Sequence, residues 1–278
     1  DGMFFDIISQ GQCCCPHCMR DMAAEGYDPE KEEDRLRFAR RTLLKYFRRT
    51  TEAARCVDAG FPVFHNNGGL LEPGNRDLLP YFSHLELESL PTGGWGYDHF
   101  PLSAAYCRNL DHDFLGMTGK FHTTWGEFGG FKHANALRYE CAAMLAQGAK
   151  CSIGDQLHPT GQLDESTCRL IGAAYAEVEQ KEPWCRRVTS AATVAVLSNH
   201  GFKKPLRTDL KSEIGVSRLL LEAHIPFDRL DDGNDFSAYK VLILADDLRP
   251  DASLQKRLED FVAGGGKLIL SGTSILKQ

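Results

Sequence analysis

The sequence predicts an α/β protein built from parallel strands, and three observations support this fold class. Strand-like and helix-like segments alternate along the whole chain, the strand-like segments are short and apolar, and the loops after the first five of them are long and polar. Apolar strands that alternate with helices form parallel sheets covered by helices. Because barrel enzymes carry their chemistry on the loops that follow strands, the first part is expected to be the C-terminal five strands of a (β/α)8 TIM barrel.

Composition limits the classes of protein that this chain can represent. Its 278 residues, 42% hydrophobic and 25% charged, suffice for one large domain or two ordinary ones. The net charge of -6, without a basic block, argues against a nucleic-acid or anionic-membrane partner. No apolar run approaches the roughly 18–20 residues that span a bilayer. We therefore expect a soluble, cytoplasmic globular protein.

The two ends of the sequence predict that it is a fragment. It opens directly on the apolar run Met3–Phe5 without an initiator methionine, and it closes shortly after another strand-like run, residues 268–270. The first three barrel strands are accordingly expected upstream of Asp1.

In the first part, each expected strand is followed by an expected helix. The helix at 30–58 has Leu36, Leu43 and Phe47 on one stripe, as an amphipathic helix requires. The expected strands are residues 3–6, 61–66, 82–87, 114–118 and 150–153, and the expected helices are 30–58, 102–110, 135–147 and 164–179.

The expected loops become shorter after residues 182–185. Before this point long loops follow the strands, and after it short connections join each strand to the next helix. Strands are expected at 193–197, 241–245 and 268–270, and helices at 212–223 and 254–262. We expect residues 1–186 to form the barrel part and 187–278 an incomplete, flavodoxin-like doubly wound domain that serves structure or assembly. Trp184 is expected in the core.

The third expected strand carries charged residues at alternating positions. Leu85 and Leu87 fall on one face, and His84, Glu86 and Glu88 fall on the other. The outer face of a barrel packs against helices and is apolar, so the three polar side chains are expected to point inward. The alternative is an edge strand with its charges in water.

Asp6 ends the first strand, where an unpaired carboxylate would be costly to bury. Together with an inward-facing Glu it would supply the two carboxylates of a glycosidase. One of them attacks the anomeric carbon or activates water, and the other protonates the leaving oxygen. Spacing does not decide which Glu is the partner, and Asp6 as a cap for the following loop is the alternative.

The loops after the strands combine aromatic, polar and glycine residues in a way that suits carbohydrate. Flat rings stack on the C–H faces of sugars, while carboxylates and imidazoles bind hydroxyl groups. Asp155 is a further acid/base candidate, and the expected substrate-binding residues are His65, His84, Trp95, His122, Trp125, Asp155 and His158.

Cys13, Cys15 and Cys18 follow the first strand with the spacing C-x-C-x2-C. Thiolates at this spacing can bind one tetrahedral zinc ion with a fourth ligand, either His17 or a residue upstream. The alternative is that they are free thiols packed under a loop. Six further cysteines are expected to be packing residues, namely Cys56, Cys107, Cys141, Cys151, Cys168 and Cys185. No phosphate-binding loop or dinucleotide fingerprint occurs, so no further cofactor is expected.

Six segments together resemble the hypothetical glycosyl hydrolase 6 group: Phe4–Asp6, Cys13–Cys18, Phe61–Asn66, Ser83–Pro91, Gly116–Gly130 and Gly154–His158. This group is a barrel followed by a β-galactosidase-type trimerisation domain, and it includes α-L-fucosidases. The resemblance implies that Asp6 is the nucleophile, because Phe4-Phe5-Asp6 is similar to the strand-four motif of other α-L-fucosidases. Glu86 or Glu88, then Glu127, are the acid/base candidates, a choice that the resemblance leaves open. The resemblance relates the cysteines to the zinc cluster of trimeric β-galactosidases.

The leading hypothesis is therefore a retaining exo-glycosidase, fucosidase-like, that requires no cofactor for catalysis and forms a homo-oligomer through its second domain. A β-galactosidase-like activity is one alternative. A non-catalytic carbohydrate-binding or assembly module with a degenerate barrel is another. A cysteine-metal hydrolase is a third, which would need an open metal position beside the carboxylates.

Overall fold

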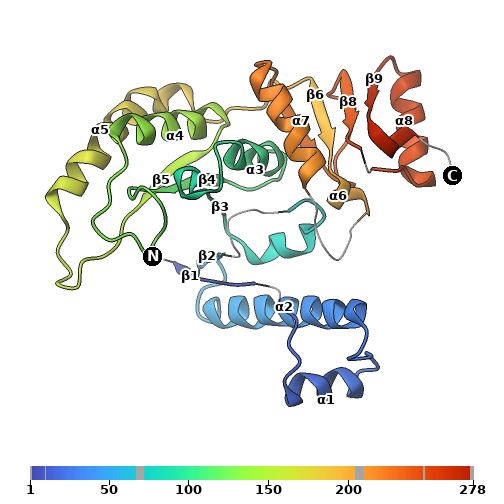
Figure 1. Ribbon diagram of the computed structural model, residues 1–278, viewed down its shortest axis with the longest axis horizontal. Helices are drawn as coiled ribbons and strands as arrows, with labels where there is room; N and C mark the ends of the chain where they lie inside the picture. Colours follow the sequence, from blue (N-terminus) through green and yellow to red (C-terminus); the bar gives the residue numbers. More distant parts are fainter. Residues whose placement is uncertain (1, 10, 67–71, 204–209, 247, 276–278) are drawn as a thin grey trace. The chain divides into compact units, whose positions relative to one another are not determined.

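The computed structural model describes residues 2–9, 11–66, 72–203, 210–246 and 248–275 (Figure 1). The chain forms two compact units. The first comprises Asp1–Gly68, Asn75–His84 and Lys204–Thr208, and the second comprises Gly69–Gly74, Leu85–Lys203 and Asp209–Gln278. Parallel strands alternate with helices in both units, which confirms the predicted α/β class.

The first unit is a strand–helix–strand crossover. Strand β1 (Met3–Phe5) pairs in parallel with β2 (Val63–His65), and helices α1 (Pro16–Ala24) and α2 (Glu32–Ala54) connect them. The short helix η1 (Arg76–Tyr81) follows β2. Helix α2 buries the predicted stripe, with Phe47 fully enclosed and Leu43 8% exposed. Helix α1 was not predicted, although Pro16 at its first turn after the capping residue Cys15 is a start signal.

The second unit begins with three βα units around one parallel sheet in the order β3-β4-β5. The strands are β3 (Leu85–Glu88), β4 (Phe114–Gly119) and β5 (Lys150–Gly154), and the helices are α3 (His99–Cys107), α4 (Ala134–Ala146) and α5 (Glu165–Lys181). The short helix η2 (Pro91–Gly93) lies in the connection from β3 to α3, and η3 (Glu182–Trp184) directly follows α5. Helices α4 and α5 lie side by side next to β5 (Figure 1).

Gly116 explains how closely the helices approach this sheet. A Cβ atom there would lie 2.6 Å from both Met144 Cγ and Phe100 Cε2. The helix-facing side of β4 therefore has room for no side chain at this position.

A second parallel sheet in the same unit has the order β7-β6-β8-β9, so the chain enters in the middle and adds strands on both sides. The strands are β6 (Val194–Leu197), β7 (Phe227–Leu230), β8 (Val241–Leu244) and β9 (Lys267–Leu270), and the helical segments are α6 (Asn199–Lys203), α7 (Lys211–Glu222), α8 (Ala252–Ala263) and η4 (Gly272–Ile275). Leu220 of α7 packs with Val196 and Ile243 on one face, together with Ala105 of α3. Leu254 and Leu258 of α8 pack on the other face.

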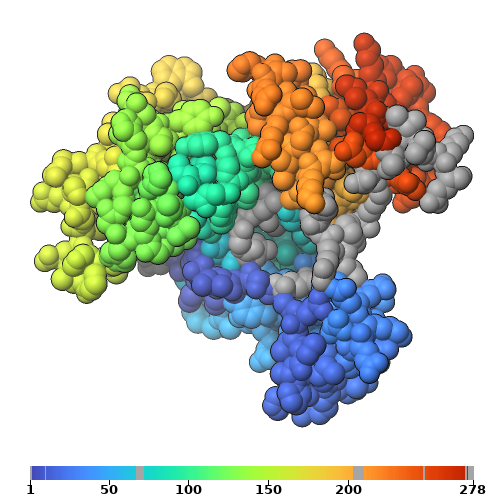
Figure 2. Space-filling view, viewed as in Figure 1, coloured from blue at the N-terminus to red at the C-terminus, as the bar shows by residue number. Residues whose placement is uncertain are grey.

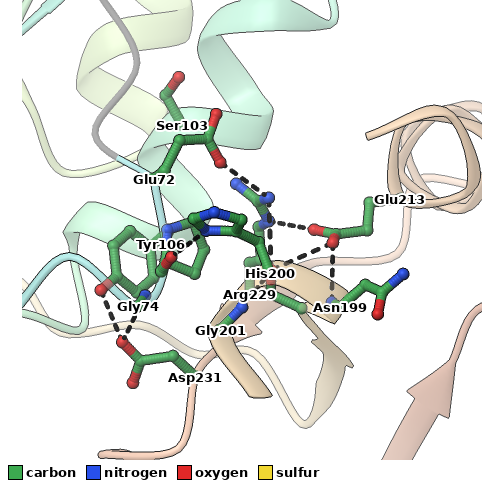
Figure 3. Close-up of polar contacts among 12 residues, drawn as sticks. Glu72, Gly74, Ser103, Tyr106, Asn199, His200, Gly201, Glu213, Arg229 and Asp231 are labelled. Carbon is green, nitrogen blue, oxygen red and sulfur yellow. Dashed lines mark hydrogen bonds and ion pairs between the residues drawn. The ribbon is translucent and has the colours of Figure 1, made fainter. Parts of the chain in front are cut away.

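A buried ionic cluster lies where β7 meets the loop after β6 and the segment Glu72–Gly74 (Figure 3). The Arg229 guanidinium is fully buried; its Nε donates to Glu213 Oε2 at 2.5 Å, and its Nη2 lies 3.5 Å from Glu72 Oε2. Beside it, Tyr106 of α3 donates to Asp231 at 2.7 Å. These bonds join α3 and the segment 72–74 to the second sheet.

Some expectations about single residues are wrong. Trp184 is 78% exposed, because it lies on the short helix η3 after α5 and not in a core. Cys107 and Cys141 are buried as predicted, whereas Cys56 and Cys168 are exposed. Among the described residues, no helix is long and apolar enough to cross a membrane.

Candidate active site

Asp6 lies at the carboxyl end of β1, as predicted, and its carboxylate is exposed. Its Oδ1 accepts hydrogen bonds from the Ile7 backbone N–H at 2.9 Å and from Asn66 Nδ2 at 3.0 Å. Asn66 directly follows β2, so two neighbouring strand ends orient this carboxylate. Ile7 has φ of +54°, a left-handed conformation that is unfavourable for a β-branched residue. Non-glycine residues in this strained conformation occur most often at functional sites.

The two histidines of the first unit differ in exposure. His65 is 0% exposed; its ring stacks on Phe5 with centroids 4.9 Å apart, and its Nε2 lies 3.0 Å from Thr51 Oγ1. Burial, with a smaller effect of the Arg55 charge, lowers the pKa of His65 to about 4. His84 is half-buried and its ring stacks on Phe64. The enclosure of His65 by aromatic rings gives it a packing role in this structure.

Strand β3 has the predicted alternation. Leu85 and Leu87 are buried at 2% and 1% exposure, and Glu86 and Glu88 alternate with them on the other face. Glu88 ends the strand and is 7% exposed. Its Oε1 accepts a hydrogen bond of 2.6 Å from the indole Nε1 of Trp125.

Trp125 connects Glu88 to the neighbouring strand ends. Its ring meets Phe121 edge-on with centroids 4.8 Å apart, and Gln156 Nε2 donates to its backbone carbonyl at 2.5 Å. A Cβ atom on Gly154 would lie 2.2 Å from Trp125 Cη2, so only glycine leaves room for the indole there. The structure thus brings together Glu88, Trp125 and the end of β5.

The loop after β3 supplies an aromatic–imidazole pair next to Glu88. Trp95 is 36% exposed, and its ring packs edge-on against His99 with centroids 4.9 Å apart. His99 Nδ1 lies 3.1 Å from Ser89 Oγ. Burial lowers the pKa of His99, while the charges of Asp98 and Glu88 oppose that effect. His99 was not among the predicted site residues; the helix was expected to begin at residue 102, whereas α3 begins at His99.

Glu127 and His122 lie in the exposed loop after β4. Glu127 Oε2 accepts hydrogen bonds from the backbone N–H and from the hydroxyl of Thr123. These bonds hold the pKa of the Glu127 carboxyl below its usual range. A carboxylate that is kept ionised in a local turn is poorly suited to donate a proton.

The loops after β4 and β5 enclose a cavity of about 290 Å³. The predicted residues Asp155 and His158 line it, and so does Lys120, which was not predicted. Lys120 Nζ lies 3.5 Å from Asp155 Oδ1. In the space-filling view, the segments after β4 (green) and after β5 (yellow-green) lie against each other (Figure 2).

Cys13, Cys15 and Cys18 meet in space as their spacing predicts. Their sulfur atoms all lie within 4.8 Å of one another at the N-terminus of α1. Hydrogen bonds from the Cys18 backbone N–H and then from the Cys13 thiol lower the pKa of Cys15 to about 7. Bound zinc needs thiolates about 3.8 Å apart, given Zn–S bonds of about 2.3 Å, so a small closure of this cluster would accommodate the ion.

Comparison with solved structures places this chain, at a coarse level, with the glycoside-hydrolase-like α/β proteins. The carboxylates, tryptophans and histidines at the carboxyl ends of its parallel strands fit that class. The chain is similar in particular to α-L-fucosidase isoenzyme 2 from Paenibacillus thiaminolyticus. The two are 50% identical over 100% of this chain and 42% of that chain, with a TM-score of 0.94.

Two β-galactosidases share the fold at lower identity. The enzyme from Bacillus circulans sp. alkalophilus is 18% identical over 86% of this chain and 40% of its own, with a TM-score of 0.69. The enzyme from Halorubrum lacusprofundi is 17% identical over 87% of this chain and 42% of its own, with a TM-score of 0.65. No family model and no curated protein matches the chain. The chain thus spans less than half of the length of each of these solved proteins.

Proposed function

We propose that this chain is part of a retaining glycoside hydrolase that removes a terminal α-L-fucosyl residue. The observation that carries the proposal is the 50% identity to an α-L-fucosidase along the whole chain. Asp6 at the end of β1 and Glu88 at the end of β3, the latter hydrogen-bonded to Trp125, are the residue types that this reaction needs.

In the proposed mechanism, Asp6 attacks the anomeric carbon and forms a covalent glycosyl ester while the bond to the leaving oxygen breaks. Its Oδ1 already accepts two hydrogen bonds, so the other carboxylate oxygen is the attacking atom. The acid/base residue protonates the leaving oxygen, then removes a proton from the water that hydrolyses the ester. The proton returns to this residue, so the enzyme is regenerated.

We propose Glu88 as the acid/base. It is buried at a strand end, whereas Glu127 is tied to Thr123 and kept ionised. The Trp125 N–H fixes the orientation of this carboxyl group.

The roles of Asp6 and Glu88 are separable by chemical rescue with azide in the natural full-length protein. Asp6→Gly is expected to lower the turnover of an aryl α-L-fucoside by at least about 1,000-fold, and azide should restore it with a glycosyl azide of inverted configuration. Glu88→Ala should instead yield a glycosyl azide of retained configuration. An Asp6→Gly variant with normal turnover would remove Asp6 from the mechanism.

A panel of aryl glycosides that includes α-L-fucoside and β-D-galactoside tests the substrate. Preference for the galactoside would favour the β-galactosidase-like alternative, whose support is likeness of fold. Sugar binding without hydrolysis of any member would favour the binding module.

We further propose that the first part of the chain contributes to a (β/α)8 barrel and the last part to a flavodoxin-like domain through which copies assemble. The three successive βα units of β3, β4 and β5 support the barrel, and the β7-β6-β8-β9 order supports the doubly wound domain. Sedimentation of the full-length protein at micromolar concentration should show an oligomer; a monomer would contradict the assembly role.

A further inference from the structure

Lys120 directly follows β4 in a rigidly held position. Its backbone N–H donates to the Gly154 carbonyl at 2.9 Å, and its own carbonyl accepts from the Lys132 N–H at 2.7 Å. The side chain is 5% exposed. The backbone thus fixes this lysine between the ends of β4 and β5.

Among the residues that the structure describes, the Lys120 ammonium has fewer hydrogen-bond acceptors within reach than it has N–H donors. Its contacts are Asp155 Oδ1 at 3.5 Å, beyond an ordinary charged hydrogen bond, and the Phe131 ring centroid at 4.7 Å. An ammonium carries three donors, and burying it without partners is costly.

Lys132 in the same loop provides a contrast. Its side chain is 1% exposed, and its Nζ donates to Thr118 Oγ1 and Glu140 Oε2, each at 2.8 Å. Tyr97 donates to the other oxygen of Glu140 at 3.2 Å. Lys132 is therefore a satisfied structural lysine, whereas Lys120 retains donor capacity.

The cavity beside Lys120 has the size and lining of a site for one monosaccharide. Its volume of about 290 Å³ lies at the lower end of the roughly 300–1,000 Å³ of small-molecule sites. Phe128 and Phe131 on its wall are 61% and 44% exposed, although large aromatic side chains are usually covered. Asp155 and Asp164 also line it, so the lysine charge is more than balanced and an anionic ligand is disfavoured.

We propose that Lys120 and Asp155 bind two neighbouring hydroxyl groups of the terminal sugar, and that Phe131 packs against its C–H face. The ammonium donates to one hydroxyl oxygen and the carboxylate accepts from the next hydroxyl. Lys120 is thereby a specificity-determining residue for a neutral sugar with a vicinal diol. This inference rests on the proposed glycosidase function, and it adds a residue and a recognition chemistry to it.

The test combines Lys120→Met with substrates that lack single hydroxyl groups, in the natural full-length protein. The probes are an aryl α-L-fucoside and its 2-, 3- and 4-deoxy analogues. Because a hydrogen bond to a charged group contributes about 1.5–3 kcal/mol, Lys120→Met should lower kcat/KM for the parent by about 10-fold to 150-fold. For the analogue that lacks the recognised hydroxyl, the same substitution should change kcat/KM by less than about threefold.

Two further variants distinguish a lost contact with the sugar from a general effect of substitution on folding. Asp155→Asn, at a side chain that is 27% exposed, should show the same pattern for the adjacent hydroxyl. Lys150→Met, at an exposed lysine paired with Asp113, should leave kcat/KM unchanged for every substrate.

The inference is overturned if Lys120→Met and Asp155→Asn leave kcat/KM for the parent within twofold, or if each lowers it equally for all four substrates. Either result would leave the roles of Asp6 and Glu88 standing, since the azide experiment tests them separately. If the wild-type protein hydrolyses no aryl glycoside, the proposed function fails and this inference fails with it.

Discussion

His65 makes the first unit sensitive to acid. Its ring is buried among aromatic side chains, and its pKa is lowered to about 4, from an ordinary value near 6.5. The unfolded chain therefore binds a proton between pH 6.5 and 4 that the folded chain excludes. The stability that follows from the neutral ring is complete above about pH 6.5 and is lost as the pH falls through 4.

We predict that the free energy of unfolding falls by about 2–3 kcal/mol between pH 7 and pH 4.5 because of this residue. Urea unfolding at both pH values measures it. His65→Gln, which retains a polar side chain near Thr51 Oγ1, should reduce the pH dependence by that amount. An unchanged pH dependence in the variant would assign the acid sensitivity to other groups.

Residue types and spacing predicted Asp6, Glu88, Trp125 and the cysteine cluster as groups of interest. Spacing alone could not separate Glu88 from Glu127, because the difference arises from Trp125 and Thr123, which reach them through the fold. Lys120 was missed for a similar reason. A lysine after a strand is usually exposed, and only the structure shows that this one is enclosed.

At the scale of elements, the end of β5 positions Trp125. Gly154→Ala would place a Cβ atom 2.2 Å from the indole ring and displace it from Glu88. We predict a loss of about 1–3 kcal/mol in the free energy of unfolding and at least a 10-fold drop in kcat for an aryl α-L-fucoside. Thermal melting and steady-state kinetics measure the two effects.

Gly172→Ala is the matched control for that substitution. Gly172 lies inside α5, where an added Cβ meets no atom within 4 Å. The change should stabilise the protein by about 0.5–1 kcal/mol and leave kcat unaltered. Equal kinetics for Gly154→Ala and Gly172→Ala would show that the position of Trp125 does not affect the reaction.

The start of α1 carries the proposed zinc site. With Cys13, Cys15 and Cys18 within 4.8 Å of one another, we predict one zinc ion per chain in the purified full-length protein. Cys15→Ser should remove the metal and lower the melting temperature, whereas Cys14→Ser, outside the cluster, should do neither. Elemental analysis decides this: absence of zinc from the wild type would contradict the site.

Most strands and helices were predictable, because apolar runs and apolar residues at helical spacing indicate which side chains are buried. Strand β7 was missed because Asp228 and Arg229 interrupt its apolar pattern. Both side chains are buried, at 1% and 0% exposure, since Arg108 binds the first and Glu213 the second. Two adjacent charged residues are typical of a loop in the local sequence. Here their ion-pair partners are distant in the sequence, so the local pattern could not reveal a buried strand.

At the scale of the whole molecule, the Arg229 cluster ties the segment 72–74 and α3 to the second sheet (Figure 3). Arg229→Met would leave Glu213, which is 1% exposed, without its cation. We predict a loss of about 3–5 kcal/mol in the free energy of unfolding, measured by urea denaturation. The double variant Arg229→Met, Glu213→Met should recover part of that loss, because no uncompensated charge remains.

Glu72→Gln should cost less than Arg229→Met. Glu72 Oε2 lies 3.5 Å from Arg229 Nη2, whereas Glu213 Oε2 lies 2.5 Å from Arg229 Nε, so the bond to Glu72 is the weaker of the two. Burial raises the pKa of the Glu72 carboxyl in spite of the nearby Arg229 charge. A loss below about 1 kcal/mol for Arg229→Met would show that the cluster does not hold these elements together.

In the proposed mechanism, Asp6 forms a covalent bond to the sugar. The most direct measurement is to incubate the full-length protein with a 2-deoxy-2-fluoro-fucosyl fluoride, which slows hydrolysis of the intermediate, and to locate the label by peptide mass spectrometry. If Asp6 is the nucleophile, one fluorosugar per chain is added to the peptide that contains Asp6, and none is added in Asp6→Asn. A label on Glu88 or Glu127, or turnover of the reagent without any Asp6 adduct, would contradict it.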